Sequence, residues 1–254
     1  MTATLRQLAP PRHDWASDAA WEQRLKRDRA RAHANQTVDQ RRVTAELLAR
    51  ACELGAEAFA LTGSTARNRR TAISDLDYHV IGPRPSPSGL CDEVDIVATN
   101  AETLLAKLRG GDDYVQWTLR FGCILLDRAG IFREAARVLT IEHVWPETGR
   151  KHERLPVHRR HAERLIEIGD RDAAHEQVRA ALTAAARAAL LDAGVFPLSR
   201  AELSEQLDAT GRERLAAALR TSIDGRPSLN GLAQLIDAIG EAEQGQSDVR
   251  ARSS

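Results

Sequence analysis

Apolar residues recur at helical spacing in the N-terminal part of the chain. Between residues 18 and 54, several of them fall three or four positions apart, as on one face of a helix: Val43, Leu47, Leu48 and Ala51. Gly55 ends this pattern, so residues 18–54 predict one long helix or two shorter ones. The preceding residues include two adjacent prolines and show little periodicity, and we interpret 1–17 as an N-terminal arm.

The pattern then changes to short β-prone runs. Four such runs end in or beside turn residues: AFALTG, LDYHVIG, EVDIVAT and GCILLD. Two segments with helical spacing lie between the third and fourth runs: AETLLAKLRGG and DDYVQWTLRF. We therefore expect a small mixed sheet with helices, within one domain that covers residues 18–145 and includes the N-terminal helical region.

The remainder of the chain has helical periodicity almost throughout. Glycine and proline interrupt it at intervals, as expected for turns between successive helices. We predict an all-α C-terminal domain over residues 146–245 and a polar, flexible tail over 246–254. The fold class is thus α+β, with a small mixed-sheet domain followed by a helical one.

Composition narrows the functional classes. The 254 residues are 43% hydrophobic and 28% charged, which is typical of a soluble globular protein. The formal net charge of zero and the 4% of aromatic residues argue against a long nucleic acid as partner. Three cysteines, Cys52, Cys91 and Cys123, lack the spacing of a metal site and are interpreted as buried small side chains. Without a signal core or a long apolar stretch, we expect a cytoplasmic protein with no membrane partner.

Two aspartates one residue apart open the second β-prone run. Side chains at alternate positions of a strand share a face, so Asp75 and Asp77 are expected to point the same way. Two carboxylates at such a short distance repel each other unless a cation lies between them, and Mg²⁺ prefers such oxygen ligands. Asp95, in the third run, brings a third carboxylate, with Asp92 and Glu93 as rivals for this role.

A Gly-Ser turn precedes this pair. Gly63 and Ser64 follow the first apolar run, and a helix is expected to start near Thr65. Glycine allows close approach of a ligand to the backbone, and amides at such a turn bind anions. Arg67, Arg69 and Arg70 follow and offer charge-assisted bonds to phosphate.

Together these residues resemble the signature of the DNA polymerase beta-like nucleotidyltransferase superfamily. The resemblance lies in GSTAR, from Gly63 to Arg67, in SDLD, which ends at Asp77, and in Asp95 as third acid. It is nearest to the branch of the antibiotic (aminoglycoside and lincosamide) nucleotidyltransferases and the minimal nucleotidyltransferases. QWTLRFGCILLD, residues 116–127, is similar to a stretch that follows the sheet in that branch.

The resemblance implies transfer of a nucleoside monophosphate, usually AMP from ATP, to a hydroxyl, with release of pyrophosphate. Two Mg²⁺ ions would be held by Asp75 and Asp77, and Asp95 would bind the metal nearer the acceptor and act as, or assist, the general base. The triphosphate would lie on Gly63, Ser64 and Arg67, together with Asp75 and Asp77. Many minimal members have Arg-Gly where this chain has Arg67-Asn68, so the arginine that contacts phosphate is left open.

The acceptor is not specified by these residues. We expect a small hydroxylated molecule, for which the resemblance implies an antibiotic and hence a role in antibiotic resistance. Nucleotidylation of a protein or tRNA, as in toxin–antitoxin systems, and a non-catalytic nucleotide-binding regulator are the alternatives, and the oligomeric state is open. Two nearby residues are interpreted as structural: His79 as a strand histidine with an ordinary hydrogen bond, and Trp117 as core.

Overall fold

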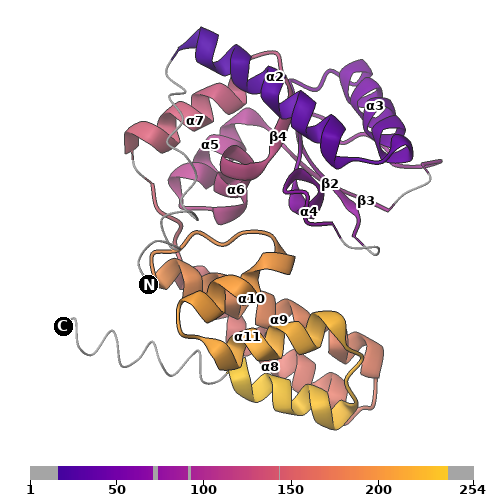
Figure 1. The fold of residues 1–254 in the computed structure, drawn as a ribbon, viewed down its shortest axis with the longest axis vertical. Coiled ribbons are helices and arrows are strands. Elements are labelled where there is room, and N and C mark those ends of the chain that lie inside the picture. The colour runs from indigo at the N-terminus through magenta and orange to yellow at the C-terminus, as the bar shows by residue number, and fades with distance from the viewer. Residues whose placement is uncertain (1–16, 71–73, 91–92, 143, 240–254) are drawn as a thin grey trace. The chain divides into compact units, whose positions relative to one another are not determined.

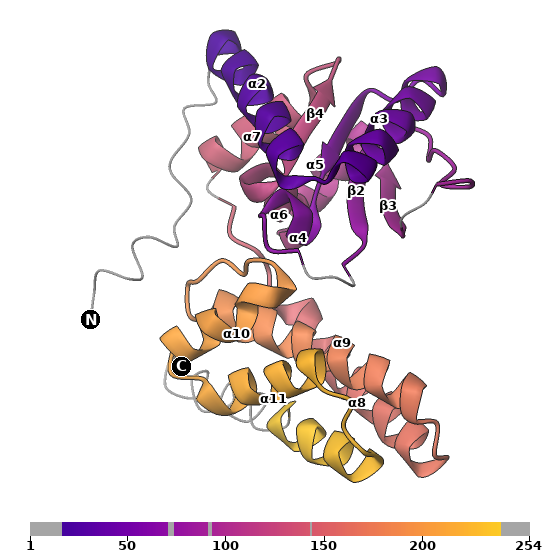
Figure 2. The ribbon, with the colours of Figure 1, turned by 45° about the vertical axis from the view of Figure 1, so that its right-hand side comes forward.

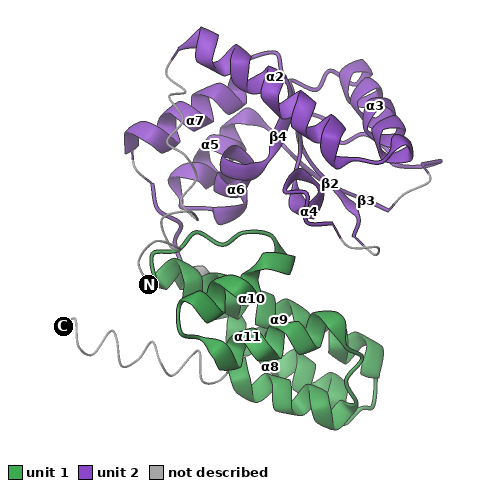
Figure 3. Cartoon of the chain, viewed as in Figure 1, with its two compact units in different colours: residues 1–9, 148–254 green, residues 10–147 purple. Residues whose placement is uncertain are grey.

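A computed structural model describes residues 17–70, 74–90, 93–142 and 144–239 (Figure 1). The described residues divide into two compact units, one over residues 17–147 and the other over residues 148–239 (Figure 3). The predicted arm, apart from Ser17, and the predicted tail lie outside the described residues. Within the described ranges, every helix is too short or too polar to span a bilayer.

The N-terminal helical region consists of two helices. These are α2, Asp18–Asn35, and α3, Val38–Glu53. Thr37 separates them: its hydroxyl accepts a hydrogen bond from the Gln40 amide, while the Gln40 side chain accepts one from the Thr37 amide. This reciprocal cap starts a new helix and settles the choice between one helix and two.

A four-stranded mixed sheet forms the centre of this unit, and the α+β fold predicted from the sequence is confirmed. Its spatial order is β3-β2-β1-β4, with β1 antiparallel to β2 and β4, and β2 parallel to β3. A one-turn helix, α4, follows β1 and begins at Gly63 rather than near Thr65 as predicted. The bounds are β1 Ala58–Leu61, α4 Gly63–Ala66, β2 Leu76–Ile81, β3 Val94–Thr99 and β4 Cys123–Asp127.

Helices cover both faces of the sheet (Figure 2). On one face, the buried Tyr78 ring lies beside Phe59, and its hydroxyl is 2.7 Å from the Thr44 hydroxyl of α3. The other face carries Ala60 and Ile81, which belong to one core cluster with residues of three further helices. These are α5, Ala101–Arg109, α6, Asp113–Phe121, and α7, Ile131–Glu142.

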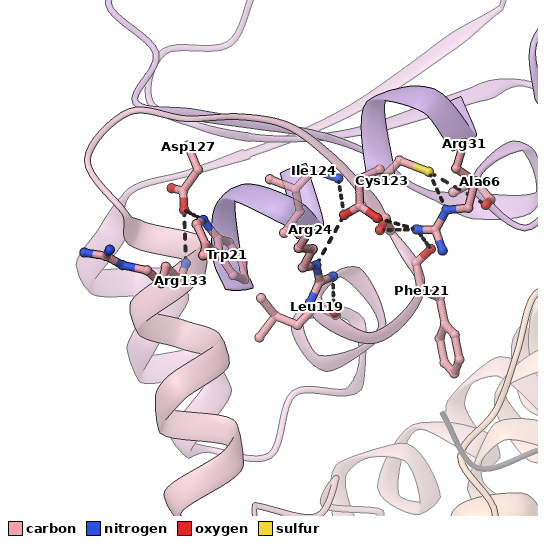
Figure 4. Close-up of polar contacts among 12 residues, drawn as sticks. Trp21, Arg24, Arg31, Ala66, Leu119, Phe121, Cys123, Ile124, Asp127 and Arg133 are labelled. Atoms are coloured by element: carbon pink, nitrogen blue, oxygen red, sulfur yellow. Dashed lines mark hydrogen bonds and ion pairs between the residues drawn. The ribbon is translucent and has the colours of Figure 1, made fainter. Parts of the chain in front are cut away.

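Buried polar groups of α2 fasten the end of α6 to β4 (Figure 4). The Arg24 guanidinium donates to the Leu119 carbonyl and, at 3.2 Å, to the Asp28 carboxylate. Asp28 in turn accepts a hydrogen bond of 3.1 Å from the Ile124 amide. Because a buried ion pair needs such additional partners to offset the loss of hydration, this network specifies how α2 sits on the sheet.

The second half of α2 also reaches α4. Arg31 donates to the carbonyls of Phe121 and Gly122, at 3.1 and 2.7 Å, and the Asn35 amide donates to the Ala66 carbonyl at 3.2 Å. The turn after β1 and the end of α6 are therefore held by the same helix. Of the cysteines, Cys123 is buried as predicted, Cys52 is only half-buried, and Cys91 lies outside the described residues.

The second unit is all-α, as predicted. Its helices pack around a core rich in alanine, which allows close approach of the helix axes. The bounds are α8 Gly149–Glu167, α9 Arg171–Asp192, α10 Arg200–Ala209 and α11 Glu213–Asp224, and residues 229–239 are also helical.

Candidate active site

Three polar residues form a row across the sheet. Asp77 of β2 is paired in register with Asp95 of the parallel strand β3. On the other side of β2, the Thr62 amide donates to the Asp77 carbonyl at 2.8 Å, directly after the last paired residue of β1. Because cross-strand neighbours share a face of a sheet, Thr62, Asp77 and Asp95 lie side by side on one face.

Two more carboxylates, those of Asp75 and Glu93, lie next to Asp77 and Asp95 toward the start of the strands. We call these four carboxylates the acidic row. Asp75 lies just before β2 rather than within it, is exposed, and precedes Asp77 by two positions. The Leu76 amide donates to the Glu93 carbonyl at 2.9 Å, so the pairing of the two chain segments extends to this point. Glu93 therefore lies two positions before Asp95 on the same side, beside Asp75. Asp92, the other rival of Asp95, is outside the described residues.

The Gly-Ser turn lies directly against Asp77. Gly63 has φ +65°, and a Cβ at this position would be 1.8 Å from Asp77 Oδ2 and 2.6 Å from Asp77 Cγ. Only glycine adopts this backbone conformation readily and also leaves room for the carboxylate. The structure thus brings together the turn and the aspartates that the sequence singled out.

The residues after the turn are held by local contacts. The half-buried Ser64 accepts hydrogen bonds at its carbonyl from the amides of Arg67 and Arg69, at 3.2 and 2.9 Å. The Arg67 guanidinium lies 5.0 Å above the ring of Phe121, at the end of α6. Asn68 has φ 55°, a conformation that Gly and Asn tolerate best.

His79 follows Asp77 on the same face of β2 and is covered by α6. It is 1% exposed, its Nδ1 is 3.2 Å from the Thr118 hydroxyl, and its ring packs on Tyr114 and Phe132. Burial, assisted by the nearby Lys107 charge, lowers the pKa of His79 to about 4. His79 is therefore neutral near pH 7, and its hydrogen bond is the ordinary one expected for a strand histidine.

Tyr114 borders the acidic row, and no sequence motif pointed to it. Its ring centroid is 5.2 Å from that of His79, one step along the face from Asp77. Burial raises the pKa of the Tyr114 phenol, the carboxylates of Asp77 and Asp95 raise it further, and the Thr62 side chain opposes them. The phenol is therefore a neutral hydroxyl within electrostatic reach of both aspartates.

The donor set suits a hard cation, although the side chains do not converge on one point. Among the described residues, no three His, Cys, Asp or Glu side chains are gathered closely enough to hold a metal ion as they stand. The chemistry of the donors nevertheless fits Mg²⁺, since Asp75, Asp77 and Asp95 are adjacent carboxylates on one face. Asp75 and Asp95 are exposed, so their side chains are free of packing that would prevent rotation toward an ion.

Comparison with known proteins gives a similarity in fold. No family model and no curated protein matches the chain. The crystal structure of a nucleotidyltransferase-like protein from Exiguobacterium sibiricum 255-15 is similar to it, with 16% sequence identity and a TM-score of 0.41. The similarity covers 83% of this chain and 76% of that chain. The chemistry of the site therefore rests on the residues of this chain alone.

Proposed function

We propose that the chain is a magnesium-dependent nucleotidyltransferase that transfers AMP from ATP to a hydroxyl group and releases pyrophosphate. One observation carries the proposal: the acidic row, which includes Asp75, Asp77 and Asp95, lies against a glycine turn whose open backbone touches the Asp77 carboxylate. Paired carboxylates beside an unobstructed turn are what transfer of a nucleotidyl group requires, because one part binds cations and the other admits phosphate.

Each carboxylate has a distinct proposed part. Asp75 and Asp77 would hold the cations and, through them, the triphosphate. Bound Mg²⁺ would supply positive charge that offsets the charge developing on the phosphate oxygens. Asp95, on the outer strand of the pair, would also be a ligand and would accept the proton of the acceptor hydroxyl. The acceptor oxygen forms a bond to the α-phosphorus as the bond from that phosphorus to the bridging oxygen of pyrophosphate breaks.

The turn and the following arginine would bind the triphosphate. The absence of a side chain at Gly63 leaves the backbone open, and the next residue, the half-buried Ser64, carries a hydroxyl. Arg67 would contribute a guanidinium that its packing on Phe121 keeps at the turn. These contacts favour a ligand with several phosphate groups, since each oxygen can accept a charge-assisted hydrogen bond.

The acceptor class proposed first is a small hydroxylated molecule. The neutral net charge and the few aromatic residues of the chain support a compact acceptor over a long nucleic acid. An antibiotic is the small molecule that the resemblance of residues 63–77 implies, and aminoglycosides and lincosamides are the first panel to test.

The test is transfer of label from ATP by the full chain. With Mg²⁺, an acceptor panel and ATP labelled at the α-phosphate, label should move to a small molecule, whereas label at the γ-phosphate should leave as pyrophosphate. Asp77→Asn should abolish transfer, and Asp39→Asn, an exposed aspartate on α3, should retain it. Label on protein or RNA would show that the acceptor is a macromolecule and not a small molecule. Tight ATP binding without transfer by wild type would overturn the catalytic proposal.

A further inference from the structure

Tyr114 lies where α6 covers the acidic row. Its ring packs against His79, and the Thr118 hydroxyl of the next turn donates to the Tyr114 carbonyl at 3.1 Å while lying 3.2 Å from His79 Nδ1. The first turn of α6 is thereby attached to β2 through a buried histidine. This attachment holds the Tyr114 side chain against His79, which lies two residues after Asp77 on the same face of the sheet.

The Thr62 side chain lies near enough to the Tyr114 phenol to affect its pKa, and it serves no helix cap. Threonine just before a helix normally accepts a hydrogen bond from an amide of the first turn, but Thr62 makes no such bond to α4. The side chain is fully buried, and its Oγ1 has no partner in hydrogen-bond geometry among the described residues. A buried hydroxyl left in this state costs free energy, so its position near Tyr114 and next to Asp77 calls for a functional reason.

We propose that Tyr114 and Thr62 act as a hydroxyl pair that holds the turn at Gly63 against Asp77, which makes Tyr114 a positioning residue for the reaction. The inference rests on the proposed nucleotidyl transfer. Thr62 is the residue through which this works, because its amide is bonded to Asp77 and its carbonyl carbon is joined to Gly63. A Tyr114–Thr62 hydrogen bond, closed when nucleotide is bound, would fix both the carboxylate and the turn.

Tyr114→Phe isolates the hydroxyl because it keeps the ring on His79. If Tyr114 positions the reacting groups, kcat should fall about tenfold, while the KM for ATP and the melting temperature stay close to those of wild type. Thr62→Val should have a similar effect, and the double variant should be little worse than either single one, since both remove the same interaction. Thr62→Ser, which keeps the hydroxyl, should retain most of the wild-type activity.

The chain provides a matched control, since it contains two tyrosines. Tyr78 lies on the opposite face of β2, where its hydroxyl bonds to Thr44. Tyr78→Phe removes a buried hydroxyl from the residue next to Asp77, on the opposite face of the strand, and it should lower the melting temperature with kcat preserved. A Tyr114→Phe enzyme with wild-type kcat, or one whose kcat loss only follows a loss of stability, would overturn the proposal.

A second readout does not depend on turnover. With ¹³C at the tyrosine Cζ, the wild-type chain should give two NMR signals, of which only that of Tyr114 should move on addition of Mg²⁺ and ATP. An unmoved Tyr114 signal would overturn the inference even where wild type transfers AMP. If wild type transfers no label, the proposed function fails, and this readout alone decides whether Tyr114 borders an ATP site.

Discussion

Asp77 and Asp95 are direct cross-strand neighbours in the parallel pair of β2 and β3. Like charges at such positions repel each other and destabilise a sheet. A chain that keeps two carboxylates there, with Asp75 and Glu93 beside them, loses stability for as long as no cation binds. Under the proposed function, this register would couple cation binding to the stability of this sheet edge.

Asp95→Asn should separate the effect of charge repulsion on stability from the effect of cation binding. Without Mg²⁺, the variant should be more stable than wild type by about 0.5 kcal/mol, because one of the repelling charges is gone. Added Mg²⁺ should raise the melting temperature of wild type more than that of the variant, since a ligand that binds only the folded state stabilises it. Thermal unfolding with and without MgCl₂ measures both, and AMP transfer should fall at least about a hundredfold.

Asp39→Asn serves as the control, because it removes an exposed carboxylate far along the chain from the acidic row. It should leave the response to Mg²⁺ and the rate of transfer unchanged. A wild-type melting temperature that is insensitive to Mg²⁺, or an Asp95→Asn enzyme with full activity, would remove Asp95 from the proposed metal site.

Gly63→Ala should damage both the fold and the site. The added Cβ meets Asp77 Oδ2 at 1.8 Å, and φ +65° disfavours alanine regardless of space. Gly55→Ala is the matched control: Gly55 has φ +84°, and no atom of the described residues lies within 4 Å of an added Cβ. We expect a cost of about 1 kcal/mol at Gly55, from the backbone alone, and a cost larger by about 1–3 kcal/mol at Gly63.

A double variant tests whether the additional cost comes from Asp77. Gly63→Ala combined with Asp77→Ala removes the carboxylate that the new methyl group meets. Chemical denaturation should then show that the double variant is more stable than the sum of the two single effects predicts. Strict additivity would mean that the turn does not contact Asp77.

His79 should make stability fall in mild acid. Its folded-state pKa of about 4 lies below the value of 6.5 for a free histidine, so the unfolded chain takes up a proton first as the pH falls. The contribution of neutral His79 is complete above pH 6.5 and is lost as the pH drops from there toward 4. At 1.36 kcal/mol for each pKa unit, the loss from this residue is roughly 3 kcal/mol.

His79→Gln is the variant that checks this. Glutamine can still bond to the Thr118 hydroxyl but does not titrate, so its free energy of unfolding should depend less steeply on pH between 6.5 and 4 than that of wild type. Denaturation at a series of pH values measures the difference between the two proteins. Parallel curves would show that another group controls acid unfolding.

The elements of the α+β unit were predictable because their signals are local. Apolar and polar residues alternate in the strand LDYHVI around Asp77, and the Gly63 turn follows an apolar run. The alternation and the turn residues were therefore enough to place both. The break between α2 and α3 also had a local signal, the Thr37 to Gln40 capping box, which periodicity alone left undecided.

The geometry of the site was harder to predict from the sequence than the elements were. Period two predicts which side chains share a face of one strand, but the register of Asp77 with Asp95 depends on tertiary packing of a second strand. The same holds for Glu93, interpreted only as a rival of Asp95 and found beside Asp75. Tyr114 comes to the row from a helix 37 positions after Asp77, and no spacing rule links them.

Arg67→Gln tests the proposed contact between this arginine and the triphosphate. As a triphosphate ligand, Arg67 contributes equally to the ground state and the transition state, so its loss should raise the KM for ATP about tenfold with little change in kcat. Its stacking on Phe121 adds a structural part worth about 0.5–1 kcal/mol, visible as a small decrease in stability.

Phe121→Leu distinguishes the two parts, because it removes the ring beneath Arg67 and retains the charge. It should reproduce the loss of stability but raise the KM for ATP far less than Arg67→Gln does. Equal KM values for Arg67→Gln and wild type, together with the lower stability, would instead identify Arg67 as a clamp between α4 and α6. The triphosphate would then depend on Gly63, Ser64 and the carboxylate-bound cations, without a guanidinium at this position.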